Sequence, residues 1–378
     1  MERSVTSAEP APVAVRPWLR GGFWDTTVLA YGWVPFYLWC VFGLGLGREG
    51  WGLPALPRGA HRSAFATAVV IALAITYVHR HYTFILVYGD RRSFAARARA
   101  YVGAPVVVFG LVALARASID TRVFGVSPWL VVAVITGAWN VWHTLQQRYG
   151  IGRIYAAKLD AIRGPRPTVA SGRLDRLLLW SLALLTACVL LVLRTSSFGG
   201  HRSARDLLRV LAPVLRPPLG SLWLGLVAVL TVIVAVRWVR ADVAGVARPS
   251  LLLPRWSFVG STVALLAVFV VHGPIVGYLC FGTAHAIEYV GFVHHFAARK
   301  YERERGSVAA AVFASLWRAP LPVAVLLLAF WLARDVRDEA IYVVYYISTS
   351  LLHFLFDGWI WKVRAPEVRQ PLLRAQGS

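Results

Sequence analysis

The stretch GTAHAIEYVGFVHHF, residues 282–296, places three histidines and a glutamate inside a segment that is apolar enough to lie within a membrane. An ionisable side chain in the hydrocarbon costs about 2.5–3.5 kcal/mol on insertion scales, so such residues normally face the interior of a helix bundle and pair there. The stretch therefore predicts a membrane helix with one polar, inward-facing side.

The rest of the chain has the composition of a membrane protein. Of its 378 residues, 58% are hydrophobic and only 15% are charged, and the mean hydropathy is +0.59. Soluble domains are about 45–50% apolar, and a membrane-crossing helix needs about 20 apolar residues. We predict an all-α, polytopic helical bundle of about ten transmembrane helices, over residues 23–47, 64–88, 101–116, 127–147, 177–193, 218–236, 257–271, 275–297, 320–333 and 340–362.

The domain organisation follows from these spans. Residues 1–22 are Pro/Ala-rich and charged, and predict a disordered cytoplasmic tail. Residues 23–363 form a single transmembrane domain, and residues 364–378 form a second cytoplasmic tail. The basic segment Arg148–Arg176, which contains Gly and Pro, predicts a cytoplasmic loop. Most Lys and Arg residues fall on the side that holds both termini, so the positive-inside rule places the termini in the cytoplasm.

The net charge of +22 does not indicate a nucleic-acid partner, because the basic residues lie between helices and not along one face. Basic loops suit the anionic headgroups of a lipid bilayer. The preference for Arg over Lys suggests a GC-rich bacterium, which gives a bacterial inner membrane as the expected location. Three cysteines without a CxxC pair, Cys40, Cys188 and Cys280, predict neither a disulfide framework nor a zinc site.

Seven of the ten histidines fall on predicted helices, at overlapping depth toward the cytoplasmic side; the other three, His61, His201 and His272, belong to loops or turns. At about 100° per residue, His285, Glu288 and His295 share one face of their helix, and His294 points away. His79 and His81 lie about 200° apart, so at most one of them aims at the shared point, and the sequence does not choose between them.

Two further helices contribute polar stripes to the same level. His353 and Asp357 are one turn apart on the last helix. Asn140, His143 and Gln147 follow one stripe of the fourth. Imidazoles together with one or two carboxylates suit iron. We therefore predict a metal site of one or two non-haem iron ions, with candidate ligands His79, His81, His143, His285, His295 and His353. Glu288 and Asp357 are candidate catalytic carboxylates, and Asn140, Gln147 and Tyr289 would orient the imidazoles.

This pattern resembles the prokaryotic membrane dioxygenases that cleave β-carotene to retinal, through YLCFGTAHAIEYVGFVHHF (278–296) and LLHFLFDGWIWK (351–362). It is more remotely similar to the membrane desaturases and hydroxylases, whose HxxxH and HxxHH boxes are absent here. The first resemblance implies iron ligands at His79 or His81, His143, His285 or His295, and His353.

The expected function is a membrane oxidoreductase of lipid metabolism. Iron and molecular oxygen would oxidise a lipid-soluble substrate, such as an acyl lipid, isoprenoid or carotenoid, with a possible redox partner. Two alternatives use the same side chains. One is a transporter or proton relay, and the other is a bis-histidine b-haem protein that transfers electrons.

Overall fold

The computed structural model describes residues 16–123, 125–163, 171–193, 211–244, 248–302, 306–313, 315, 318–335, 339–362 and 366–373. The described part is helical, and its only β-pairing is an isolated bridge between Val123 and Val126. The amino-terminal half contains α1 (Gly22–Trp24), η1 (Asp25–Ala30), α2 (Val34–Leu38), η2 (Trp39–Gly43), η3 (Arg48–Trp51), α3 (Arg58–Tyr88), α4 (Arg91–Ala95), α5 (Ala98–Ala117), α6 (Pro128–Arg163) and α7 (Gly172–Leu193). The remainder contains α9 (Leu219–Val243), η5 (Pro249–Leu252), α10 (Leu253–Lys300), α11 (Val308–Phe313), α12 (Pro320–Asp335), α13 (Glu339–Ile360) and α14 (Pro366–Leu373).

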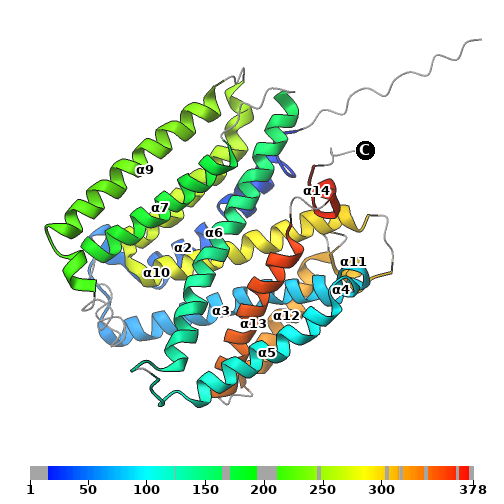
Figure 1. Ribbon diagram of the computed structural model, residues 1–378, viewed down its shortest axis with the longest axis horizontal. Coiled ribbons are helices and arrows are strands. Elements are labelled where there is room, and N and C mark those ends of the chain that lie inside the picture. Colours follow the sequence, from blue (N-terminus) through cyan, green and yellow to red (C-terminus); the bar gives the residue numbers. More distant parts are fainter. Residues whose placement is uncertain are drawn as a thin grey trace, which may run out of the picture.

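The helix α10 is a hairpin of two helices. Gly273, with φ of 84°, interrupts the helical geometry just before Pro274, and the ribbon doubles back there (Figure 1). The rings of Phe269, before the turn, and Phe281, after it, lie 5.8 Å apart. A positive φ favours glycine because it has no Cβ. The predicted turn between residues 271 and 275 is therefore present.

The second half of this hairpin is the centre of the bundle. α3 and α6 each contact α10, and α13 contacts both α3 and α6. α7 packs on both α9 and α10, so that α7 and α9 form an outer layer. On the other side, α5 packs on α13, and α12 packs on α3. Four helices that are far apart in sequence thus meet around one point.

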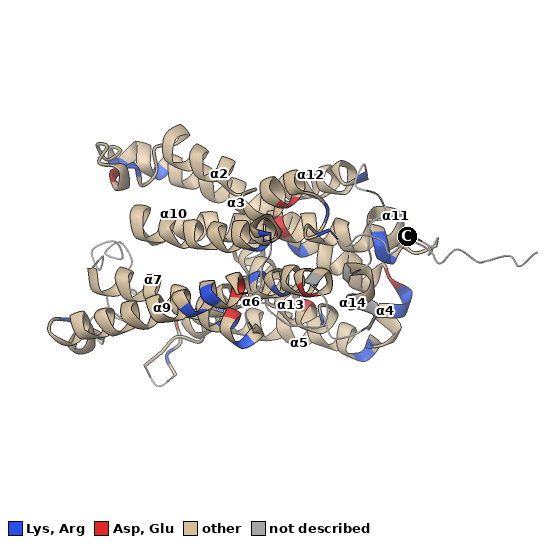
Figure 2. Ribbon diagram, turned by 90° about the horizontal axis from the view of Figure 1, so that it is seen from above, with Lys and Arg blue, Asp and Glu red and all other residues tan. Residues whose placement is uncertain are grey.

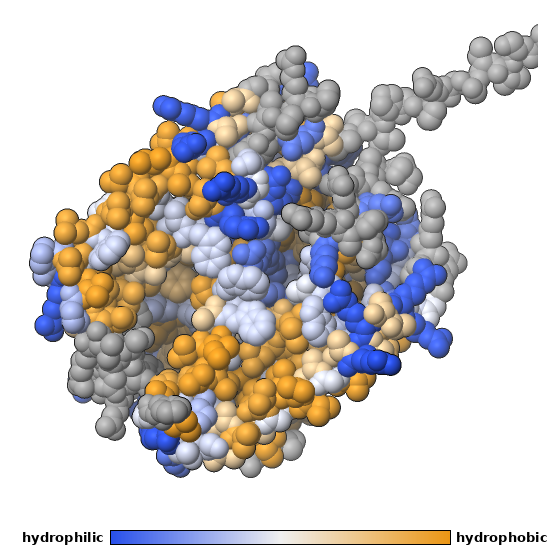
Figure 3. Space-filling view, viewed as in Figure 1, coloured by the Kyte–Doolittle hydropathy of each residue, from blue (hydrophilic) through white to orange (hydrophobic). Residues whose placement is uncertain are grey.

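The outer surface is apolar along the helices. The exposed large hydrophobic residues of α9 include Leu222, Leu226 and Val229, and those of α5 include Val106 and Leu111. Figure 3 shows apolar surface over both regions, and Figure 2 shows Lys and Arg gathered around α4 and α11 at one end of the bundle. Exposed apolar faces of this extent are typical of helices that contact lipid.

Within the described residues, six helices are long and apolar enough to cross a membrane, or seven if the bent pair Gly22–Ala30 and Val34–Gly43 forms one span. α10 is one of these six, and its 48 residues would extend about 72 Å if straight, which is more than two membrane cores. Several long apolar helices thus agree with the predicted membrane bundle. The count of ten and the side of the termini stay predictions.

One sequence expectation needs correction. The predicted loop Arg148–Arg176 is largely helical, because α6 continues to Arg163 and α7 begins at Gly172. The continuation of α6 buries apolar residues such as Ile151, Tyr155 and Leu159, which explains why it stays helical beyond the apolar run. The expected tail 364–378 includes the helix α14, whose Val368 and Leu372 are buried in the same cluster as Leu19.

Candidate metal centre

Four histidines from four helices meet inside the bundle. His79 comes from α3, His143 from α6, His285 from α10 and His353 from α13, and we call these four residues the histidine cluster. Their side chains are buried, with exposed fractions of 4%, 7%, 1% and 0% respectively. Ring centroids lie 4.6 Å apart for His79 and His353, 4.8 Å for His79 and His285, and 4.9 Å for His143 and His285.

Four nitrogens of the histidine cluster lack hydrogen-bond partners among the described residues. Both ring nitrogens of His79, Nε2 of His143 and Nδ1 of His285 are buried without one. Nε2 of His285 faces Nε2 of His353 at 3.5 Å. Buried polar atoms are normally paired, and an unpaired one costs about 1–3 kcal/mol. Several lone-pair donors that converge without a proton donor between them suit a cation.

Two sets of donor atoms are close enough to share an ion. His79, His285 and His353 form one set, and His143, His353 and Asp357 form the other, with the donor atoms of each set within 4.8 Å of one another. Imidazole nitrogen with one carboxylate oxygen is a donor set suited to iron, and zinc or copper accept similar ligands. The residues present therefore fit a metal ion.

The hydrogen bonds of Thr83 indicate which ring nitrogen of His353 carries the proton. Its Nδ1 lies 2.7 Å from Oγ1 of Thr83. The single hydroxyl proton of Thr83 is directed at Asp357 Oδ1, 2.9 Å away, or at the Tyr289 hydroxyl, 2.6 Å away. With its proton on either of these oxygens Thr83 accepts from His353, an arrangement that favours a proton on Nδ1 and leaves the Nε2 lone pair directed into the histidine cluster.

Asp357 joins the same network. Its Oδ1 accepts from Tyr289 at 2.8 Å, and its Oδ2 lies 3.5 Å from Nε2 of His143. Trp361 donates to the Tyr289 hydroxyl at 3.3 Å. Tyr289 is thus linked to the histidine cluster through Asp357 and Thr83, and its orienting role stays a prediction. Thr83 lies four residues after His79 on the same face of α3, but the sequence pattern predicted no role for it at the site.

Glu288 pairs with an arginine and not with the predicted metal site. It forms a buried ion pair with Arg148, whose other nitrogen donates to Thr262 at 2.7 Å. Its carboxylate belongs to neither donor set. The structure therefore gives Glu288 the role of neutralising Arg148, next to the histidine cluster. Gln147 donates to the backbone oxygen of His285 at 3.2 Å and so holds that helix, not an imidazole.

The remaining candidates lie outside the histidine cluster. His81 is satisfied by the Tyr77 carbonyl at 2.7 Å and the Tyr345 hydroxyl at 2.6 Å, so the structure chooses His79 over His81. His295 is buried but belongs to neither donor set. Asn140 donates to the Tyr278 hydroxyl at 2.6 Å and not to an imidazole.

The other histidines have separate surroundings. His294 lies 3.1 Å from the Tyr82 hydroxyl, and His272 bonds to the Gly47 carbonyl and the Tyr37 hydroxyl. His61 lies near the start of α3, outside both donor sets, and His201 lies outside the described residues. Neither His272 nor His294 belongs to the histidine cluster.

No protein-family model, curated protein or solved structure matches this chain. The resemblance drawn from the sequence therefore stays a prediction, and the function is argued from the site alone.

Proposed function

We propose that the protein is a membrane-embedded, metal-dependent oxidoreductase that uses non-haem iron and molecular oxygen on a lipid-soluble substrate. The observation that carries the proposal is the convergence of four buried imidazoles, four of whose nitrogens have no hydrogen-bond partner among the described residues. Iron bound there would supply oxygen activation. Expected surroundings are the bacterial inner membrane, with the site toward the cytoplasmic side.

The protein's own residues have separable tasks in this proposal. Nε2 of His353 is held free of a proton by Thr83, and Asp357 adds one negative charge beside the imidazoles. Tyr289 and Thr83 hold Asp357 in place by hydrogen bonds. Orientation by such neighbours typically changes metal affinity or activity 10–100-fold.

An apolar approach to the site lies beside α6. His143 is the least buried member of the histidine cluster, and its ring lies 4.9 Å from that of Phe354. Trp139, one turn earlier on α6, packs near the same phenylalanine at 6.1 Å. We propose that a lipid-soluble substrate approaches along these rings from the bilayer, because apolar molecules need no aqueous route.

The alternatives use the histidine cluster differently. A bis-histidine haem needs two opposed imidazoles with a flat macrocycle between them, whereas three or four clustered rings suit a small ion. A proton relay needs hydrogen-bonded neighbours along its path. Nitrogen atoms that face one another without a donor favour the metal over both.

The test is the metal content of the detergent-purified protein. We expect stoichiometric iron without a haem absorption band, and loss of that iron in His353→Ala. The matched control is His81→Ala, which removes a membrane histidine only two positions from His79 and should leave the metal bound. A haem band would favour electron transfer, and metal-free protein after reconstitution with iron would favour a relay. Equal metal content in both variants would refute the site.

A further inference from the structure

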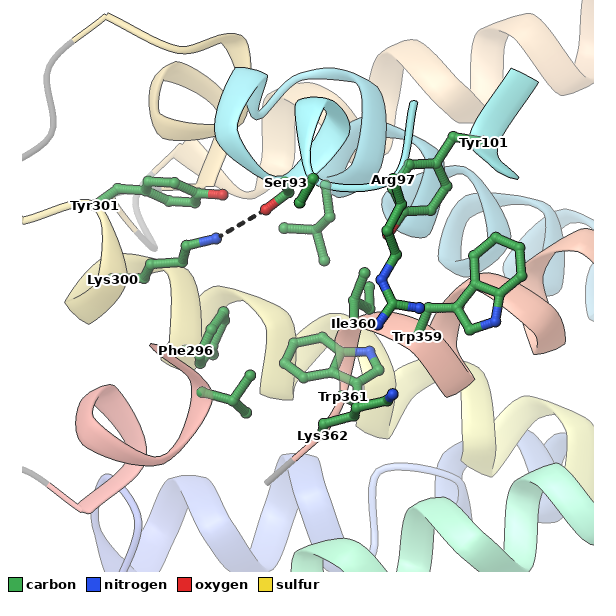
Figure 4. A pocket seen from close by; sticks show the side chains of 13 residues that line it. Ser93, Arg97, Tyr101, Phe296, Lys300, Tyr301, Trp359, Ile360, Trp361 and Lys362 are labelled. Atoms are coloured by element: carbon green, nitrogen blue, oxygen red, sulfur yellow. Dashed lines mark hydrogen bonds between the residues drawn. The ribbon is translucent and has the colours of Figure 1, made fainter. Parts of the chain in front are cut away.

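A cavity lies at the end of the bundle where α4, α11 and α14 gather, and no residue of the histidine cluster lines it. Its volume is about 160 Å³. One water molecule needs roughly 10–15 Å³ on the same measure, so the cavity has room for a small polyatomic group. Its lining includes Arg97, Lys300, Trp359, Trp361 and Lys362 (Figure 4). We call this cavity the basic pocket.

The basic pocket carries an excess of positive charge. Three of its lining residues are cationic, and none of its described lining residues is Asp or Glu. Lys300 bonds to Asp90 at 2.6 Å, and Asp90 also receives the Tyr301 hydroxyl at 2.9 Å and the Ser93 hydroxyl at 3.0 Å. Three lining residues, Lys300, Tyr301 and Ser93, thus share the Asp90 carboxylate, which neutralises Lys300. Within the described chain, Arg97 and Lys362 have no carboxylate partner.

Aromatic rings give the basic pocket a fixed wall. The Arg97 guanidinium lies 6.0 Å from the Trp359 ring centroid, and the Trp361 ring packs on Phe296 at 5.0 Å. In Figure 4 the Arg97 and Lys362 side chains reach toward Trp361 from different parts of the chain. Two separately anchored cations that converge on one cavity suit a multivalent anion better than a single monovalent one, because a phosphate has several acceptor oxygens.

We propose that the basic pocket binds a phosphate group through Arg97 and Lys362, with Lys300 at its edge. The group comes either from the headgroup of an anionic phospholipid or from a soluble phosphate compound, since both present the same oxygens. The proposal does not depend on metal in the histidine cluster. Trp361 lines the basic pocket and donates to Tyr289, so the bound phosphate lies within two side chains of Asp357.

The experiment uses the full chain, purified in detergent and stripped of lipid. Binding of phosphatidylglycerol is measured by native mass spectrometry, and binding of radiolabelled inorganic phosphate by equilibrium dialysis. We expect saturable, one-to-one binding of at least one probe, and the probe that binds identifies the source. The double variant Arg97→Gln/Lys362→Gln should weaken that binding by about tenfold or more, because it removes both charged donors.

The control is Arg91→Gln/Arg99→Gln, which removes two exposed arginines from the same end of the bundle. It lowers the net charge equally but leaves the basic pocket intact, so binding should be unchanged. All four side chains are exposed, and the thermal unfolding midpoint of each variant checks the fold. Equal weakening in the two double variants would show nonspecific attraction to the basic end and would overturn the proposal, as would the absence of saturable binding of either probe.

Discussion

The histidine cluster differs from a second buried polar group, made of Arg153, Asp175, Asp242 and Arg255, which we call the ion cluster. In the ion cluster every nitrogen of Arg255 donates. Its Nε lies 2.7 Å from Asp242, its NH1 lies 3.3 Å from Asp175, and its NH2 also contacts Asp175. Arg153 and Trp238 donate to Asp175 at 2.7 and 2.8 Å. Each charge there has its partners inside the protein.

The two clusters show how a buried polar group can indicate its role. The ion cluster ties α6, α7, α9 and α10 together and leaves no capacity for a ligand. The histidine cluster also joins four helices, but four of its ring nitrogens have no hydrogen-bond partner among the described residues. A network in which every polar atom is hydrogen-bonded stabilises the fold. Buried nitrogens that converge without hydrogen-bond partners instead indicate a site for a bound metal ion.

Breaking the ion cluster should have the largest effect on stability. Arg255→Met leaves Asp242 and part of Asp175 as uncompensated buried charges, and we expect a loss of about 3–5 kcal/mol in the free energy of unfolding. Chemical unfolding of the metal-stripped protein measures it. His285→Ala in the same assay should cost less, because its Nδ1 makes no hydrogen bond in the described structure.

Arg240→Met is the control for that comparison. Arg240 is an exposed residue of α9, so its replacement should stay within about 0.5 kcal/mol of the original protein. If Arg255→Met were as mild as Arg240→Met, the ion cluster would not be the structural counterpart of the histidine cluster.

Metal addition should stabilise only those proteins that keep the histidine cluster intact. A ligand at a thousandfold excess over its Kd stabilises the folded state by about 4 kcal/mol. We expect ferrous iron to raise the unfolding midpoint of the stripped protein and of Arg255→Met, but not that of His285→Ala. An equal rise in all three proteins would place the metal elsewhere.

Removing the Tyr289 hydroxyl should have a smaller effect, on metal affinity alone. Tyr289→Phe deletes a donor to Asp357 while the ring contacts remain, and we expect metal affinity to fall about 10–100-fold. Competition with a chelator measures it. Tyr82→Phe is the control, because Tyr82 is equally buried but bonds to His294, outside the histidine cluster. Unchanged affinity in Tyr289→Phe would remove Tyr289 from the orienting network.

Sequence spacing predicted the parts of the site that depend on one helix. His353 and Asp357, one turn apart, do lie together, and His285 does point inward. The choice between His79 and His81 depended on a different helix, because Tyr345 of α13 engages His81. Such contacts between helices cannot be read from the periodicity of either one.

Glu288 illustrates a different limit. Its angle on the helix was correct, but the predicted fourth span ended at residue 147, immediately before Arg148. A charged residue after an apolar run suggests a loop, whereas here α6 continues and buries Arg148 against Glu288. Hydropathy analysis scores each residue of a buried ion pair as a separate charge. It therefore predicts that the helix ends there, although the two charges neutralise each other inside the bundle.

Another buried carboxylate, Asp90, extends the comparison to the edge of the bundle, and its replacement should have the smallest effect. Burial alone would raise the pKa of Asp90, but the hydrogen bonds and charge of Lys300, with Ser93 and Tyr301, outweigh burial and lower the pKa to about 2. The folded value lies below the ordinary value of 3.8, so ionised Asp90 stabilises the fold above about pH 4. That contribution is lost as the pH falls toward 2. We expect the difference in unfolding midpoint between the original protein and Asp90→Asn to shrink over this interval, whereas a difference that is constant from pH 5 to pH 2 would show that Asp90 stabilises by packing and not by its charge.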